Sequence, residues 1–287
     1  MKQYPATAIR NVAVAGHNGV GKTTLVSALL HEAGAVNRFG RVEDGSAPTD
    51  FDPEEIERKI SIGLAVAALE WKKHKVNLLD TPGYGIFASE MICAMRAADA
   101  ALLVVDAVAG VEVQTEKAWS VADEFGLPRM VVVNRMDREN ADGGRVMDQL
   151  QKKFGRSCVC IEAPIGKEKG FRGTIDLIGM KGFLTDDSGK TAEGPIPEEF
   201  AADAATLLAR SFKLPTERAE VWARYLATAP PRPYFERALL ERAEALLDAG
   251  RTAEAKRILD ELRRGRSLTE AQQRQLDRLL LKAKDSR

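Results

Sequence analysis

The stretch that decides the predicted fold is Gly16-His17-Asn18-Gly19-Val20-Gly21-Lys22-Thr23. It matches the pattern G-x-x-x-x-G-K-[ST], in which glycines let backbone N–H groups curl around a phosphate. In that pattern the lysine reaches the outer phosphate oxygens, and the hydroxyl of the next residue ligates Mg²⁺. An apolar run before the stretch predicts a strand and the residues after it predict a helix, which is the required context. The stretch predicts a nucleoside triphosphate site but does not select a base.

Strand and helix patterns alternate on either side of this stretch. The apolar runs 100–107 (AALLVVDA) and 128–134 (PRMVVVN) are typical of parallel strands covered on both faces. Helical patterns lie near 87–98 and 113–125. Residues 36–60 are polar and have no period, which predicts a long functional loop. The expected fold class is therefore α/β, a P-loop nucleotide-binding fold with a mostly parallel sheet.

Two further motifs indicate that the base is guanine. The first, DTPG at residues 80–83, ends a predicted strand, where Asp80 can hold Mg²⁺ and the Gly83 N–H can sense the terminal phosphate. The second, NRMD at residues 134–137, ends another strand. The carboxylate of Asp137 can accept hydrogen bonds from guanine N1–H and the 2-amino group, a donor pair that adenine lacks. Three motifs in this order, each at the carboxyl end of a strand, predict GTP binding.

The composition excludes several other classes of protein. The chain has 287 residues and equal numbers of basic and acidic residues, 42 of each, so no overall field for a polyanion is expected. No apolar run is long enough for a membrane span, and the first residues lack the apolar core of a secretory signal. Three sparse cysteines, Cys93, Cys158 and Cys160, do not form a disulfide framework or a zinc site. Cys158 and Cys160 alternate along a predicted strand, which indicates two reduced core thiols. A cytoplasmic location without membrane or specific DNA binding is expected.

With these motifs, the run RKISI at residues 58–62 and the segment APIGKEKGFRGTIDLIGMKGF resemble the G domain of elongation factor G and its elongation factor G-like relatives. The resemblance covers about residues 8–210. It implies that residues 36–62 are switch I, with Ser61 in the place of a Mg²⁺-binding threonine, and that residues 80–90 are switch II. It also implies that a small α+β insert subdomain forms a partner-binding surface, with the ribosome or another activating partner as the candidate.

Several positions depart from the family pattern. Tyr84 stands where the family carries a catalytic histidine, and a phenol cannot readily supply a positive charge to the attacking water, so slow turnover is expected. Gly19 stands where the family often has aspartate. The strand and Ser-Ala-Leu/Lys loop that close the guanine site in the family have no counterpart after residue 210.

The predicted site combines these assignments. Its catalytic residues are Lys22 and Tyr84, and its Mg²⁺ ligands are Thr23, Ser61 and Asp80. The residues predicted to bind the nucleotide are Gly16, His17, Asn18, Gly19, Val20, Gly21, Lys22, Thr23, Thr24, Asp80, Thr81, Pro82, Gly83, Tyr84, Asn134, Arg135, Met136 and Asp137.

The predicted domains are a G domain at 1–156, an insert subdomain at 157–214 and an α-helical extension at 215–287. A proline-rich break at 229–233 is followed by three predicted helices, and Ser267 with Glu270 predicts a capping box for the third. Their apolar positions are Phe235, Leu239, Ala243, Leu246, Ala255, Ile258, Leu259, Leu262, Leu268, Leu276, Leu279 and Leu280. Within the extension, residues 234–266 weakly resemble one tetratricopeptide-type helix pair. These helices either cover the open sheet edge or form a separate protein-binding module. An excess of basic residues after Gly250 could contact RNA, but without interleaved aromatic residues a solvated helix face with ion pairs is favoured. The three tryptophans are interpreted as packing residues.

The function expected from this sequence is hydrolysis of GTP to GDP and phosphate, with a role in or derived from translation elongation. One alternative is a non-hydrolysing GTP-dependent adaptor whose helical tail binds a protein partner. Another is a truncated or recombined product that folds poorly and has no evolved activity.

Overall fold

The computed structural model describes residues 3–155, 157–186, 189–228, 230, 234–265 and 268–285. The chain divides into two compact units, Met1–Lys153 and Phe154–Arg287, which are called the first and second unit below. Among the described residues, no helix has both the length and the apolar character needed to cross a lipid bilayer.

The first unit is built on a five-stranded sheet in the order β2-β3-β1-β4-β5. Its strands are β1 (Ile9–Gly16), β2 (Ala65–Trp71), β3 (His74–Asp80), β4 (Ala100–Asp106) and β5 (Arg129–Asn134). Only β2 runs antiparallel to its neighbour, and every other pair is parallel. The mostly parallel sheet predicted from the sequence is confirmed.

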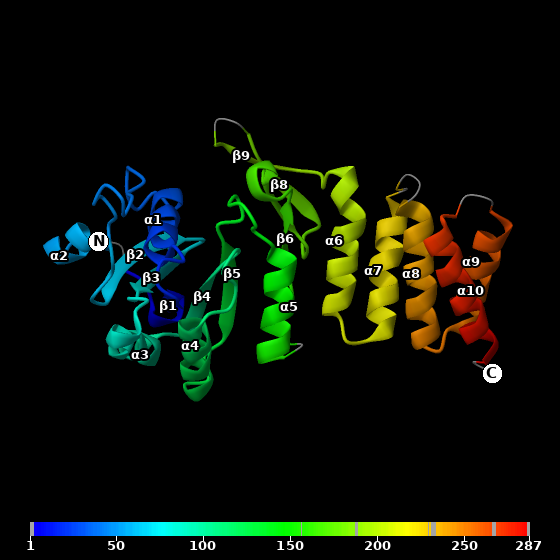
Figure 1. Cartoon of the computed structure of the whole chain (residues 1–287), viewed down its shortest axis with the longest axis horizontal. Helices are drawn as coiled ribbons and strands as arrows, with labels where there is room; N and C mark the ends of the chain where they lie inside the picture. Colours follow the sequence, from blue (N-terminus) through cyan, green and yellow to red (C-terminus); the bar gives the residue numbers. More distant parts are fainter. Residues whose placement is uncertain are drawn as a thin grey trace. The chain divides into compact units, whose positions relative to one another are not determined.

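Helices cover both faces of this sheet (Figure 1). The helices are α1 (Lys22–Glu32), α2 (Pro53–Arg58), α3 (Ala88–Ala97), α4 (Val113–Glu124) and α5 (Gly143–Phe154), with short 3-10 turns η1 (Ala6–Ala8) and η2 (Gly85–Phe87). Met95 of α3 and Ala122 of α4 pack with Leu103 in the core on one face. Val26 and Leu30 of α1 pack on the other. The core thus fixes the carboxyl ends of the strands, where the site lies.

Two details of the first unit differ from the sequence predictions. The loop predicted at 36–60 contains α2, whose start is stabilised by Asp52: its carboxylate accepts a hydrogen bond from Glu54 N at 2.8 Å, and Pro53 takes the first helical position. The prediction that both apolar strands are covered on both faces is wrong for β5. None of its residues is buried, because β4 is its only neighbour in the sheet.

The second unit begins with a four-stranded antiparallel sheet in the order β6-β7-β8-β9. The strands are β6 (Glu162–Ile165), β7 (Gly173–Asp176), β8 (Lys181–Thr185) and β9 (Thr191–Gly194), and the 3-10 turn η3 (Glu168–Gly170) follows β6. Cys158 and Cys160 precede β6, so their predicted place on a strand is wrong, although the partly buried Cys160 packs against the core of this sheet. All three cysteines are free, and Cys93 is exposed.

Five helices follow this sheet: α6 (Glu198–Ser211), α7 (Pro215–Ala227), α8 (Tyr234–Asp248), α9 (Thr252–Arg264) and α10 (Glu270–Asp285). Figure 1 shows them as a row of successive helices. Ala204 of α6 packs into the core of the small sheet, while Ala205 of the same helix packs with Trp222 of α7. Because α6 belongs to both groups, the predicted division into domains at residue 214 stays a prediction.

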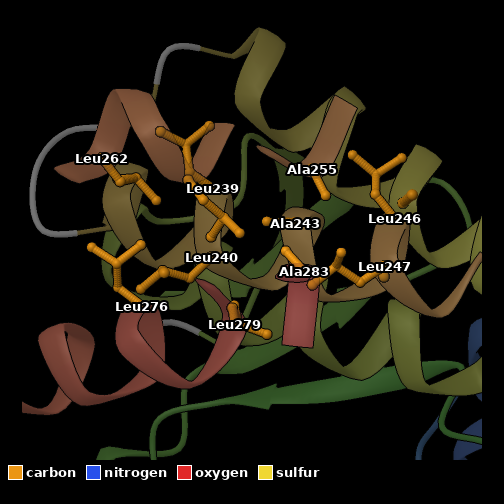
Figure 2. Packing of buried hydrophobic residues seen from close by; sticks show 13 residues of the cluster. Leu239, Leu240, Ala243, Leu246, Leu247, Ala255, Leu262, Leu276, Leu279 and Ala283 are labelled. Carbon is orange, nitrogen blue, oxygen red and sulfur yellow. The ribbon is translucent and has the colours of Figure 1, made fainter. Parts of the chain in front are cut away.

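The apolar positions predicted for the last three helices form one core (Figure 2). Leu239, Ala243 and Leu246 of α8 meet residues from α9 and α10. The other predicted positions that are buried in or packed against this core are Phe235, Ala255, Ile258, Leu259, Leu262, Leu268, Leu276, Leu279 and Leu280. The helical periodicity of the sequence thus identified the packing surface of each helix correctly.

Several polar contacts between alternate helices span 34 residues. Arg237 of α8 donates to Asp203 of α6, Arg278 of α10 to Glu244 of α8, and Lys282 to Asp248. A spacing of 34 is the repeat length of tetratricopeptide arrays. The helix pair that the sequence indicated, α8 and α9, is therefore flanked by helices stacked in the same way rather than standing alone.

The start of α10 carries a capping box, but in a different register from the predicted one. Thr269 Oγ1 accepts from Gln272 N at 3.3 Å, and Gln272 Oε1 accepts from Thr269 N at 2.9 Å. The predicted cap Ser267 lies outside the described residues, as do the prolines at 231 and 233 and the basic residues at 266 and 287. Within the described tail, Arg251–Glu254 and Arg274–Glu270 are ion pairs along single helices, as the solvated-face interpretation expects.

The three tryptophans differ in their surroundings. Trp222 is buried, as its interpretation as a packing residue requires, and Trp119 lies under the Arg129 guanidinium at 4.4 Å from its ring centroid. Trp71, at the end of β2, is 50% exposed, so for this residue the packing interpretation is wrong.

The core shown in Figure 2 allows a prediction about how substitutions in α10 change the stability of the protein. Leu279→Ala should lower the free energy of unfolding by about 2–5 kcal/mol, because a fully buried leucine leaves a cavity. Leu281, two residues further along α10, is 63% exposed, and Leu281→Ala should change the same quantity by about 0.5 kcal/mol or less. Urea denaturation followed by circular dichroism measures both, and equal losses would contradict the assignment of this core.

Candidate functional site

The residues predicted from the three motifs meet at one edge of the first sheet. Gly16 ends β1, Asp80 ends β3 and Asn134 ends β5. These strands are parallel members of one sheet, so their carboxyl ends lie on the same side. In open α/β sheets this edge is where ligands bind. The fold therefore brings together segments that are more than 100 residues apart in the sequence.

The loop between β1 and α1 is shaped around the Lys22 side chain. The buried ammonium donates to the carbonyls of Gly16 at 3.2 Å and His17 at 2.9 Å, which curls the loop over it. Burial lowers the pKa of Lys22 to about 8, although the Asp80 carboxylate acts in the opposite direction. The helix α1 begins at Lys22, so its positive end points toward the loop. This arrangement concentrates N–H donors and positive charge on a short stretch of backbone.

The DTPG turn is tightly packed against this loop. A Cβ atom at Gly83 would lie 2.5 Å from Lys22 Nζ and 2.7 Å from the backbone N of Asn18, so only glycine fits. The hydroxyl of Thr81 donates to Val14 O at 2.8 Å and joins the end of β3 to β1. The two motifs therefore form a single compact surface, and Thr81 serves that surface by holding the strands together.

The carboxylate of Asp80 gathers hydroxyl groups around it. Thr49 Oγ1 donates to Asp80 Oδ2 at 2.8 Å, while Oδ1 is buried and accepts no hydrogen bond from any described residue. Burial raises the pKa of Asp80, and the hydroxyls of Thr49 and Thr23 and the ammonium of Lys22 oppose that shift. The sequence analysis missed Thr49, although a hydroxyl in the long polar loop at 36–60 was the available signal.

Ser61 reaches the same cluster from the end of that loop. Its Oγ lies 3.1 Å from Thr23 Oγ1, so the two predicted hydroxyl ligands are neighbours. The buried Glu55 accepts hydrogen bonds from Ile62 N at 2.7 Å and Gly63 N at 2.9 Å, which holds the residues directly after Ser61. Glu55 thus positions Ser61 through the backbone, and nothing in the sequence pattern pointed to it.

These groups suit a magnesium ion. Two hydroxyls and a carboxylate with a buried, unbonded oxygen are hard oxygen donors, the kind that Mg²⁺ prefers. Among the described residues, no group of three or more His, Cys, Asp or Glu side chains could hold a metal ion. Such a sparse protein donor set fits an ion that shares its coordination with phosphate oxygens and water, as Mg²⁺ does in nucleotide sites.

The NRMD segment is tied to the phosphate loop and to β4. Asn134 Nδ2 donates to Val20 O at 2.9 Å, and Arg135 donates to Asp106 Oδ2 at 2.9 Å. Burial acts to raise the pKa of Asp106, but backbone N–H groups and the Arg135 guanidinium hold it below its usual value. Arg135 has a positive φ of 64°, a strained conformation for a residue other than glycine. The sequence analysis missed Asp106, which ends β4 at the same sheet edge.

Asp137 lies beyond this anchored segment. Its side chain is exposed, and no hydrogen bond links it to another described residue. An exposed carboxylate next to a braced turn is available to a ligand that offers two N–H donors in one plane.

Comparison with known proteins identifies the family of this site. The family model described as the elongation factor Tu GTP binding domain matches residues 7–220. The chain belongs to this family of translational GTPases. The elongation factor G resemblance seen at about residues 8–210 is therefore confirmed.

Two relatives show how far this likeness extends. The chain is 39% identical over 206 residues to "Elongation factor G 2" of Streptomyces coelicolor, covering 71% of this chain and 30% of that protein. The structure is similar to a crystal structure of a protein from Thermus thermophilus, with a TM-score of 0.68 and 36% identity over 83% of this chain and 36% of that one. The chain thus spans about a third of the length of each of these two relatives.

One residue and one element of the chain depart from the pattern that the resemblance implies. Tyr84 follows the DTPG turn and precedes η2, and its side chain is 38% exposed. The closing strand of the guanine site has no counterpart either, because every element after β9 in the described part of the chain is a helix. These two departures lie on the water side and the base side of the site, and Gly19 adds a third within the phosphate loop.

The buried carboxylate of Asp50 makes the stability of the folded chain depend on pH. Burial, together with the nearby carboxylates of Asp80 and Glu55, raises the pKa of Asp50 to about 6. Its value in an unfolded chain is about 3.9. The unfolded chain therefore releases this proton first as pH rises, so the contribution of Asp50 to stability is lost between about pH 4 and pH 6.

We expect Asp50→Asn to remove this loss of stability at higher pH. In chelator and without nucleotide, the free energy of unfolding of the variant minus that of the wild type should be larger at pH 7.5 than at pH 4.5. Urea denaturation at both values measures the difference. The exposed Glu57 on α2 supplies a control, Glu57→Gln, outside this buried cluster. A difference for Asp50→Asn that stays constant with pH would contradict the shifted pKa.

Proposed function

We propose that this chain binds Mg²⁺ and GTP at the described sheet edge and hydrolyses GTP slowly to GDP and phosphate. The observation that carries the proposal is the hydrogen bond from Asn134 to Val20 O, which connects the NRMD segment directly to the phosphate loop. It supports a site in which one ligand carries both a guanine base and a triphosphate.

At the phosphate end, the backbone N–H groups of residues 16–24 and the helix dipole of α1 bind the phosphate oxygens. Lys22 neutralises charge there, since its ammonium is held under the loop by two carbonyls. The N–H of Gly83, packed against Lys22 and Asn18, is placed to sense the terminal phosphate. Loss of that phosphate would release the segment after Gly83, which is the expected behaviour of a switch.

Thr23, Ser61 and Asp80 are the residues that would hold Mg²⁺. The ion supplies charge neutralisation for the phosphates when it is bound. Thr49 orients Asp80 by its hydrogen bond, and Glu55 holds the backbone behind Ser61. Two of the three predicted ligands, Asp80 and Ser61, thus have a supporting residue.

At the base end, Asp137 accepts hydrogen bonds from guanine N1–H and the 2-amino group. Arg135 carries its aliphatic stem alongside the base while its guanidinium is fixed by Asp106. Met136 completes the turn between them. The described part of the chain supplies no strand after β9 to close this end of the site, so we expect weaker binding of the base.

Catalysis in this proposal is positioning and charge stabilisation of the attack of water on the terminal phosphate. Tyr84 can donate a hydrogen bond to that water or to the phosphate but supplies no positive charge near neutral pH. Intrinsic turnover is therefore slow, and an activating partner would complete the site. We propose the ribosome as that partner, in the cytoplasm, with residues 157–214 as an insert subdomain that contributes to its recognition.

A second candidate is a GTP-dependent adaptor that does not hydrolyse its ligand. The helices α6 to α10 favour it, because they form a stacked array with a 34-residue spacing and such arrays are used as binding surfaces. In this alternative, residues 215–287 carry the function and the G domain at 1–156 regulates it. Turnover measured with and without ribosomes distinguishes the two candidates.

The base site is tested by titration with fluorescent GDP in magnesium, competed by GTP and by ATP. GTP should displace the probe and ATP should not. Asp137→Asn should weaken GTP binding by about 1–3 kcal/mol, the cost of a mispaired polar group, and favour xanthosine nucleotides, whose 2-oxo group accepts from an amide. Glu139→Gln, an exposed residue of the same loop, is the control. Unchanged GTP affinity in Asp137→Asn would remove this residue from the site.

The role of Tyr84 is tested by restoring the family residue. Tyr84→His should raise the single-turnover rate of GTP hydrolysis at least about tenfold near neutral pH, because an imidazole can carry a proton in this range. Fluorescent GDP affinity should stay the same. Tyr84→Phe, which removes only the hydroxyl, shows what the phenol contributes. A histidine variant no faster than the wild type would mean that turnover is limited elsewhere.

A further inference from the structure

A second concave site lies in the first unit, away from the phosphate loop. It is a cleft of about 520 Å³ lined by Gln3, Tyr4, Glu70, Trp71, Lys72 and Lys73. Strand register places it at the opposite end of the sheet. Ile9 pairs with Lys75, whereas Val14 pairs with Asp80, so the cleft and the phosphate loop are separated along the strands by roughly 20 Å.

The turn that forms one wall of this cleft has an unusual composition. Only Lys72 and Lys73 connect β2 to β3, and Trp71 pairs with His74 across the turn. Both lysines have positive φ, 45° and 67°. Two-residue hairpin turns of this kind strongly favour Asn-Gly, because other side chains are strained there. Turn geometry therefore does not explain the two lysines.

Most side chains around the turn are basic or aromatic. Lys72, Lys73 and His74 are exposed, and Trp71 presents half of its surface to solvent. Tyr4 adds a second aromatic ring to the lining, and Glu70 is its one acidic residue. Cations next to an exposed aromatic face are the combination that binds single-stranded nucleic acid: ammonium groups contact phosphates, and bases stack on the ring.

We propose that this cleft binds a short single-stranded nucleic acid segment, with Lys72 and Lys73 on its phosphates and a base stacked on Trp71. An acidic peptide would satisfy the lysines but would leave the Trp71 face without a planar partner, so a nucleic acid fits better. The site is independent of the proposed GTP site, because no residue is shared between them. Recognition is by charge and stacking, without sequence selectivity.

Because the backbone is strained at both lysines, their effect on binding can be tested separately from their effect on stability. The double variant Lys72→Asn with Lys73→Gly carries the residues that the turn geometry prefers. It should melt at a temperature equal to or above that of the wild type, because the strained conformations are removed. It should nevertheless bind a labelled ten-nucleotide oligouridylate about tenfold more weakly at low salt. The slope of log affinity against log salt should fall by about 1.4, or 0.7 per lost phosphate contact.

Two further variants test the contribution of the Trp71 ring to binding. Trp71→Ala should weaken binding about tenfold with little change in the salt slope, and Trp71→Phe should retain part of the affinity because a ring remains. The charge-matched control is Lys117→Gln with Lys152→Gln, two exposed lysines on α4 and α5, which should bind like the wild type. Fluorescence anisotropy of the intact chain measures binding, and fluorescent GDP titration of each variant reports separately on the GTP site.

The outcomes separate the proposal from its rivals. Loss of binding in the turn and Trp71 variants, with GDP affinity and melting temperature retained, supports it. Wild-type binding weaker than about 100 µM, the weak limit of non-specific association, overturns it. It is also overturned if the turn variant binds like the wild type, if the control pair loses as much affinity, or if polyglutamate displaces the oligonucleotide equally well. An oligodeoxyuridylate of equal length decides whether RNA or DNA is preferred.

Discussion

The buried carboxylate of Asp80 is the constraint on which the rest of the first unit depends. A charge removed from water at the end of a core strand must be compensated locally, and here Lys22 and two threonine hydroxyls do so. Lys22 can lie beside Asp80 only if the loop before α1 curls over its ammonium, and Gly83 must then lack a side chain. The electrostatics of one residue thus dictate the path of two loops.

The same cluster fixes the long segment between α1 and β2 at three places. Ser27 of α1 exchanges hydrogen bonds with the backbone of Gly40, Thr49 bonds Asp80, and Ser61 meets Thr23. Two of these three contacts use groups that are proposed to serve the metal and the phosphates. A change in charge at the site would therefore act directly on this segment through Thr49 and Ser61.

Much of this arrangement could be predicted from the sequence, because local patterns determine it. The glycine spacing before Lys22 predicted the turn between a strand and a helix, and the apolar periodicity of α8 predicted its buried face. Both patterns involve neighbouring residues, and both of these structural predictions are confirmed. Glu55 and Asp106 were missed because their partners are backbone N–H groups and a distant arginine, which leave no local signature. The exposure of β5 was missed for a related reason: an apolar strand looks the same whether one neighbour or two are present.

The 34-residue spacing of contacts in the second unit has a consequence for how such a chain can change over time. Arg278 and Lys282 of α10, for example, donate to Glu244 and Asp248 of α8, and Arg274 donates to Glu270 of its own helix. An array whose members bond only near neighbours can gain or lose a helix pair at its end without disturbing the packing at its beginning. The second unit is thus open to lengthening and shortening by duplication or deletion, while the first unit, bound together by contacts across more than a hundred residues, is not.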